Sequence, residues 1–172
     1  MDRTVTGHES VLSPHDTIQS RTDTGGVITF ANPTFVRISG YSREELVGAP
    51  HSIIRHPRMP RGVFYAMWQI IQAGEEFFGF VDNRCKNGDN YWVLTRVAPH
   101  RNAQGEIDAY SSVRMMPKRE AVAEWTRVYD RILQIEQAQP REKQVEAGYQ
   151  AVLKHIRKSG AKSLTDLVMR YV

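Results

Sequence analysis

The stretch FVDNRCKNGDNYWV (80–93) decides the fold, because it holds a hairpin signal between two strand-like segments. Residues 77–85 and 90–98 are rich in aromatic and β-branched side chains, and the tetrapeptide Lys86–Asp89 joins them. Its Asn-Gly pair is a strong short-range hairpin signal, because both residues tolerate the positive φ angles of a tight turn. A third segment of the same kind follows at 107–115 after another turn signal. The sequence therefore predicts a three-stranded antiparallel meander.

Helix and turn signals precede this meander. A first strand is predicted at 26–30, after an Asp-Thr-Gly-Gly turn. Asn32 caps one short helix, which has proline at its first position, and Ser42 caps a second with Glu45 as its capping-box partner. Residues 61–73 form the best helix of the first half, with apolar residues at helical spacing. This order predicts a compact α+β domain with its helices on one side of the sheet.

The chain changes character from residue 117 onward. Five apolar residues follow a 4-3-4-3 spacing there: Ala121, Trp125, Val128, Ile132 and Ile135. This heptad-like seam predicts a helix over 119–138 with more apolar surface than a lone surface helix carries. A second helix is predicted at 141–158, and Ser163 with Asp166 predicts a last short one. We expect this helical extension either to fold back on the sheet or to pair with another chain.

Composition and charge exclude several classes of protein. The 172 residues are 41% hydrophobic and 24% charged, which is ordinary for a globular protein. The formal net charge of +4 lies wholly in residues 117–172, where 11 basic side chains outnumber 7 acidic ones, and this excess is too dilute for a nucleic-acid patch. Cys85 is the single cysteine, so an internal disulfide and a multi-cysteine metal site are excluded. No apolar run is long enough to span a bilayer and no secretory signal is evident, so we expect a cytoplasmic protein.

Three stretches together carry a family resemblance: NPTFVRISGYSREELVGAPHSIIRHPRMP (32–60), FYAMW (64–68) and the hairpin at 80–93. They resemble a PAS domain, and more narrowly the FAD-binding PAS domain of bacterial aerotaxis receptors. SGYSREELVG alone indicates only PAS in general, whereas IIRHP, MP, FYAMW and KNGDNYWV in combination are far more specific. The resemblance covers about residues 20–117. It implies a PAS fold, in which an antiparallel sheet of about five strands carries short helices and one longer helix on one face, here with a C-terminal helical extension.

The resemblance also implies a function and partners. Domains of that subfamily bind FAD non-covalently and report redox, oxygen or energy state to chemotaxis signalling, and PAS domains dimerise through flanking helices. We therefore expect an N-terminal arm at 1–20, a PAS sensor domain at 21–117 and a helical output or dimerisation extension at 118–172. The expected partners are a second copy of the chain and a chemotaxis-type signalling protein. Since the chain lacks the membrane anchor and signalling module of such receptors, it is expected to be a fragment or to signal in trans.

Six positions match those that line or support the flavin pocket in the related domains: Asn32, Arg55, His56, Phe64, Trp68 and Asn83. The residue types suit this role. The planar fork of Arg55 fits phosphate or carbonyl oxygens, and the proline that follows His56 stiffens its loop. Phe64 and Trp68 lie one helical turn apart and would wall a flavin ring, while Asn83 both donates and accepts at a mixed polar edge. One departure is Arg58, since the family pattern reads Arg-His-Pro-Asp-Met-Pro.

Other interpretations stay open. Without the resemblance, Trp68 at helical spacing is more often a core residue than a cofactor wall. The flavin is FAD or FMN, since the far end of the pocket is not legible from spacing. His56 as an axial ligand would instead make the chain a haem gas sensor. A cofactor-free dimerisation or docking module is the third interpretation, which Arg58 favours. No catalytic motif and no metal-ligand spacing is present, so we expect neither an enzyme nor a metal site.

Overall fold

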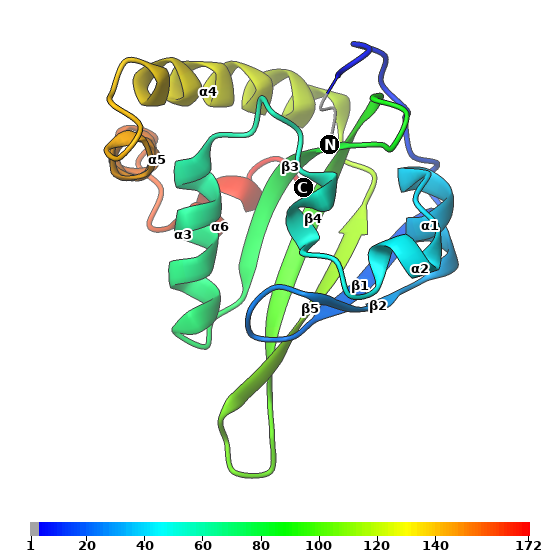
Figure 1. The fold of residues 1–172 in the computed structure, drawn as a ribbon. Coiled ribbons are helices and arrows are strands. Elements are labelled where there is room, and N and C mark those ends of the chain that lie inside the picture. The colour runs from blue at the N-terminus through cyan, green and yellow to red at the C-terminus, as the bar shows by residue number, and fades with distance from the viewer. Residues whose placement is uncertain (1–3) are drawn as a thin grey trace.

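The computed structural model describes residues 4–172 and shows an α+β fold built on one five-stranded antiparallel sheet. In the order β2-β1-β5-β4-β3, the sheet contains β1 (Thr17–Thr22), β2 (Ile28–Ala31), β3 (Phe77–Arg84), β4 (Asn90–Arg101) and β5 (Ile107–Met115) (Figure 1). The predicted hairpin pairs β3 with β4, with Arg84 opposite Asn90. β4 and β5 form a second hairpin, whose tip extends away from the rest of the domain (Figure 1). The predicted meander is thereby confirmed.

The sequence pattern misses β1, which pairs with β5 along its whole length. Residues 17–20 fall in the segment 1–20 for which an N-terminal arm is expected, and they belong to the sheet. The inward-facing side chains of β1 are Ile18, Ser20 and Thr22, all buried. Because two of these three are polar, the strand lacks the alternation of apolar and polar residues that usually reveals a half-buried strand.

Four helical segments follow β2 and lie over one face of the sheet: α1 (Pro33–Ser39), α2 (Arg43–Leu46), the 3-10 helix η1 (His51–Ile54) and α3 (Arg61–Gln72). Asn32 caps α1 by accepting a hydrogen bond from the Phe35 N–H, and its own amide donates to the Thr17 carbonyl of β1. Ser42 and Glu45 form the predicted capping box of α2. These caps fix where the chain turns back toward the sheet.

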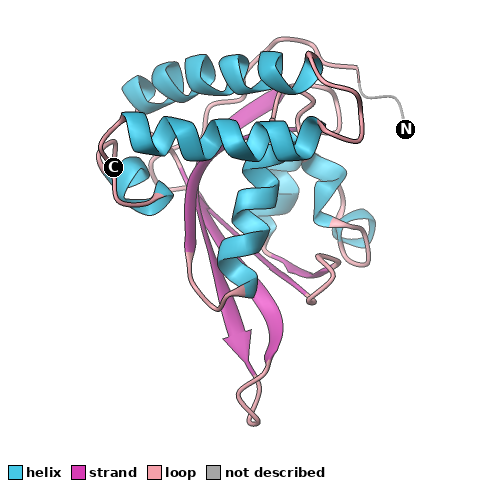
Figure 2. Cartoon of the chain, turned by 90° about the vertical axis from the view of Figure 1, so that its left-hand side faces the viewer, coloured by secondary structure: helices cyan, strands magenta, loops and turns pink. Residues whose placement is uncertain are grey.

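The C-terminal extension consists of α4 (Arg119–Gln137), α5 (Gln144–Lys158) and α6 (Leu164–Met169), and it folds back onto its own chain. α5 lies against α3, α4 against α5, and α6 against β3 (Figure 1 and Figure 2). Four of the five seam residues are buried, and Ile135 is exposed. The hydroxyl of Tyr129 donates to the Phe80 carbonyl of β3 at 2.7 Å, and its ring stacks on Trp92. The seam therefore packs against its own chain, which is the first of the two predicted alternatives.

The junction of α3, α4 and α5 is unusually close. The buried carboxylate of Glu136 on α4 accepts hydrogen bonds from the backbone N–H groups of Arg61 at 3.0 Å and Gly62 at 2.8 Å. Because the first N–H groups of a helix have no partner within it, this carboxylate serves as the cap of α3. A Cβ at Gly62 would overlap the backbone of α5 at Gly148 and Tyr149. The absence of a side chain at Gly62 thus lets α5 approach α3.

Candidate functional site

A cavity of about 320 Å³ lies between the sheet and α3. Residues of β1, β3, β4 and β5 line one side of it, α3 forms a wall, and the segment 50–55 closes another side. Its volume falls within the range of about 300–1,000 Å³ that is usual for ligand pockets. The apolar part of the lining includes Phe64, Met67, Trp68 and Ile71 of α3 with Val81 and Val97 of the sheet.

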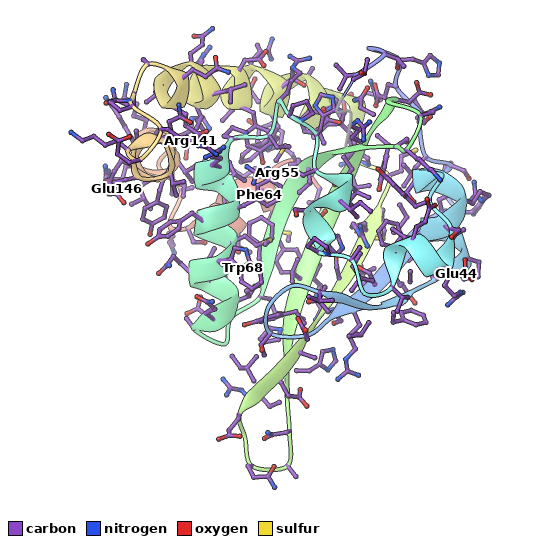
Figure 3. The ribbon with its side chains drawn as sticks, viewed as in Figure 1. Glu44, Arg55, Phe64, Trp68, Arg141 and Glu146 are labelled. Atoms are coloured by element: carbon purple, nitrogen blue, oxygen red, sulfur yellow. The ribbon has the colours of Figure 1, made fainter. Side chains whose placement is uncertain are left out.

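Aromatic rings from α3 form the wall opposite the sheet. Figure 3 shows Phe64 and Trp68 on the side of α3 that faces the strands, with Arg55 next to Phe64. The guanidinium carbon of Arg55 lies 4.3 Å from the centre of the Phe64 ring, a cation–π distance. Trp68 meets Tyr110 edge to face, with ring centres 5.6 Å apart. Both aromatic walls are therefore held in place by neighbouring side chains.

The loop that follows η1 is tied to the edge of the sheet. Arg55 forms an antiparallel bridge with Asn83 of β3, which brings these two cavity-lining residues side by side. The Arg55 side chain donates to the Met59 carbonyl at 3.3 Å, and the Met59 sulfur accepts from the Asp82 N–H at 3.4 Å. Two prolines, at 57 and 60, restrict the backbone between these contacts. The loop therefore presents Arg55 to the cavity in a fixed position.

Three cavity-lining residues carry buried polar atoms with no hydrogen-bond partner within residues 4–172. These atoms are Asn83 Nδ2, Thr95 Oγ1, and Nε and Nη1 of Arg114. Since most buried polar groups are bonded, these four donor atoms around one cavity would suit a ligand that accepts hydrogen bonds. A flavin ring has carbonyl oxygens and ring nitrogens at one end and an apolar dimethylbenzene at the other. The donors on the strands and the aromatic walls on α3 fit such a group.

Two residues that the sequence pattern does not single out, His51 and Arg114, line the same cavity together with Ser20. The Ser20 hydroxyl accepts a hydrogen bond from Nη2 of Arg114 at 2.6 Å and lies 3.1 Å from Nε2 of His51. Burial, together with the charge of Arg114, lowers the pKa of His51 to about 3, so its ring is neutral at physiological pH. Ser20, His51 and Arg114 form the basic end of the cavity.

Of the six site residues predicted from the sequence, Arg55, Phe64, Trp68 and Asn83 line the cavity, whereas Asn32 and His56 do not. The Asn32 side chain is engaged in capping α1 and in bonding to β1. His56 is buried beside β3, where its Nδ1 accepts from the Arg58 N–H at 3.3 Å and lies 3.4 Å from the Asp82 carboxylate. Asn32 and His56 therefore contact elements that surround the cavity and do not themselves line it.

The pair formed by His56 and Asp82 is electrostatically unusual. Burial, assisted by the charges of Arg58 and Arg84, lowers the pKa of His56 to about 4. Burial raises the pKa of Asp82 to about 6, although Asn90 donates to its carboxylate at 2.9 Å. Burial thus disfavours the charged form of both His56 and Asp82. Within residues 4–172 no cluster of histidine, cysteine and carboxylate side chains could hold a metal ion.

Residues 28–114 match the PAS fold as a family. The chain belongs to the PAS family. This PAS chain is 43% identical to the aerotaxis receptor of Escherichia coli K12 over 119 residues, which are 69% of the chain and 23% of the receptor. It is 33% identical to the nitrogen fixation regulatory protein of Klebsiella pneumoniae over 91 residues, 53% of the chain and 18% of that protein. The PAS chain therefore spans less than a quarter of the length of either relative.

Solved structures agree on the fold of the PAS domain. A light-oxygen-voltage domain described with a flavin analogue superposes with a TM-score of 0.59 at 18% identity, covering 64% of this chain and 84% of the other. The Aureochrome1 light-oxygen-voltage domain in its light state gives 0.56 at 24% identity, covering 63% and 90%. The family matched is the PAS fold and not a catalytic family. In the part of the chain that the structure describes, no helix is long and apolar enough to cross a membrane.

Proposed function

We propose that this chain is a cytoplasmic redox-sensing PAS domain that binds FAD non-covalently and reports the redox state of the flavin to a chemotaxis-type partner. The observation that carries the proposal is the cavity that combines aromatic walls with unpartnered donors on the strands. The similarity to an aerotaxis receptor supports the sensing role. The motifs shared with the FAD-binding domains of such receptors favour FAD over FMN.

Different side chains of the cavity would bind different parts of the flavin. Asn83 and Thr95 would donate to carbonyl oxygens of the flavin, because each has a buried donor without a partner in the described part of the chain. Phe64 and Trp68 would exclude water from the ring by covering it from α3. Arg55 would place its fork at the edge formed with Asn83 and bind a carbonyl or phosphate oxygen. The flavin, when bound, supplies reversible storage of electrons together with a change in charge and protonation.

The loop between η1 and α3 offers a route from the cavity to the C-terminal helices. One end of it presents Arg55 to the cavity. Further along, Arg58 forms an ion pair with Asp130 of α4 at 2.9 Å, and Arg61 and Gly62 are bonded to Glu136 of the same helix. A change in how Arg55 meets the ligand would therefore shift the contacts that hold α4. We propose that α4 to α6 are the output, with α4 as the first element to respond.

A cofactor-free docking module is the alternative function. The buried donors at the cavity weigh against it, because an empty pocket gains nothing from polar atoms without partners. Arg58, which favours that alternative from the sequence, has a partner in Asp130. A homodimer through the seam would require α4 to leave the sheet, since Trp125, Val128 and Ile132 are buried against their own chain. Any dimer of the folded chain would use another surface.

The donors on the strands can be tested with Asn83→Ala and Thr95→Val. Each variant removes one hydrogen bond to the flavin, so the affinity for FAD should fall about threefold to tenfold, the equivalent of roughly 0.5–1.5 kcal/mol. Far-ultraviolet circular dichroism should stay unchanged. Thr29→Val, at an exposed position of β2, is the matched control and should bind FAD like the unaltered protein. Unchanged FAD affinity in both pocket variants, measured by fluorescence titration, would show that the cavity is not the flavin site.

A further inference from the structure

Arg114 of β5 is the largest fully buried side chain among residues 4–172. Its residue is 2% exposed, and its guanidinium lies over the Phe35 ring of α1 with 4.4 Å between the guanidinium carbon and the ring centre. One nitrogen, Nη2, donates to the Ser20 hydroxyl. The other two nitrogens, Nε and Nη1, have no hydrogen-bond partner among the residues that the structure describes. A guanidinium that lines a ligand cavity thus keeps most of its donors unused.

Within residues 4–172 the charge of Arg114 has no counter-ion. No Asp or Glu lines the cavity, and Arg114 forms no ion pair in the part of the chain that the structure describes. Its titratable neighbours are His51, which is neutral, and the buried phenol of Tyr91 on β4. Burial lowers the pKa of Arg114 to about 10, so the group remains charged at neutral pH.

Burying a cation without a counter-ion costs free energy. The charge loses its hydration, and the low-dielectric interior does not stabilise it in return. The phenyl ring of Phe35 and the hydroxyl of Ser20 offset only part of this cost. A ligand that brings negative charge to the basic end of the cavity would offset the rest. The basic end is therefore built for an anion or for the negative edge of a polarised ring.

We propose that Arg114 is an anion-binding residue and that it makes the pocket bind reduced flavin more tightly than oxidised flavin. This inference rests on the proposed function. Transfer of a hydride from a donor such as a reduced nicotinamide brings two electrons and one proton to N5 of the flavin, and the added negative charge resides at N1 and the adjacent carbonyl. With this edge of the ring at the basic end, the unused donors of Arg114 would hold that charge. Arg114 then helps to set the potential at which the sensor responds.

The test measures the reduction potential of bound FAD, together with FAD affinity before and after reduction by dithionite, for Arg114→Gln, Arg114→Lys and the unaltered protein. Arg21→Gln, at an exposed position of the neighbouring strand β1, is the matched control. Arg114→Gln should lose at least about tenfold more affinity for reduced than for oxidised FAD, which lowers the potential by about 30 mV for a two-electron couple. Arg114→Lys should fall between Arg114→Gln and the unaltered protein, because it keeps the charge but not the fork. Arg21→Gln should leave the potential unchanged.

An Arg114→Gln variant that binds FAD with an unchanged potential would overturn the inference and leave the proposed function standing. If the unaltered protein binds flavin in neither redox state, both fail. Should Arg114→Gln not fold, the unaltered protein gives a second measurement. Its bound reduced flavin should keep the absorbance of the anion at pH values at which free reduced flavin has taken up a proton on N1. Protonation at the same pH as in free flavin would contradict the role of Arg114.

Discussion

The contact between α3 and α5 can be broken by one methyl group. In Gly62→Ala the added Cβ would lie 2.7 Å from the Gly148 Cα and closer still to the next two backbone atoms of α5. Ordinary contacts of a Cβ begin near 3.4 Å. Both partners are helix backbone and cannot rotate away, so the helices must separate or α5 must detach.

The expected cost follows from two opposing effects. Overpacking of a well-packed contact costs about 1–3 kcal/mol, and here the whole α3–α5 face is affected, so the upper end applies. Alanine is favoured over glycine within a helix by about 1 kcal/mol, which offsets part of this. We therefore expect a net loss of about 2 kcal/mol. For a chain of this size the melting temperature should fall by about 4–8 °C.

Thermal unfolding followed by circular dichroism measures this effect, with Gln72→Ala at an exposed position of the same helix as the control. The control should melt close to the unaltered protein. Gly62 does not line the cavity, so Gly62→Ala should still bind FAD if the PAS domain folds without a tightly docked α5. A Gly62→Ala variant that melts at or above the temperature of the unaltered protein would refute the close packing of α3 and α5.

Two other perturbations probe the loop between η1 and α3. Because the pKa of Asp82 is raised from 3.8 to about 6, the stability it contributes is present below pH 3.8 and lost as pH rises through about 6. Asp82→Asn should therefore gain up to about 3 kcal/mol relative to the unaltered protein between acid and neutral pH in denaturant titrations, and a pH-independent difference would contradict the buried carboxylate. Arg58→Asp should cost less than about 1 kcal/mol, since its pair with Asp130 is exposed, and adding Asp130→Arg should restore the loss. Equal stability of the single and double variants would mean that the pair is not formed in solution.

The elements with local signals are the ones that the sequence predicts well. The Asn-Gly hairpin, the Asn32 cap and the capping box at Ser42 all appear where the residues indicate them. Each of these signals acts within a few residues, so no knowledge of the rest of the fold is needed. β1 is missed because two of its inward-facing residues, Ser20 and Thr22, are polar and line the cavity. The polar residues that line the cavity therefore also conceal the strand in the sequence.

Only part of the candidate site could be predicted from the sequence, because local motifs can be recognised there and long-range contacts cannot. Arg55, Phe64, Trp68 and Asn83 are found because they fall in conspicuous motifs, and they line the cavity. Arg114 lies in a strand where an arginine is usually solvent-exposed, and only the pairing of β5 with β1 brings it beside Ser20. The local signal for a role of Arg114 at the cavity is that it lies on the same face of β5 as Tyr110. The basic end of the cavity is formed by the long-range pairing of β1 with β5, which residue spacing in the sequence does not reveal.

The central claim is that the cavity holds a flavin, and the absorbance spectrum of freshly purified chain tests it most directly. Any released cofactor should then be identified by chromatography after heat denaturation. The chain should show flavin absorbance bands and release FAD. A bare protein spectrum that persists after incubation with FAD and with FMN would mean that the cavity holds no flavin, and the function would then have to be sought in the C-terminal helices.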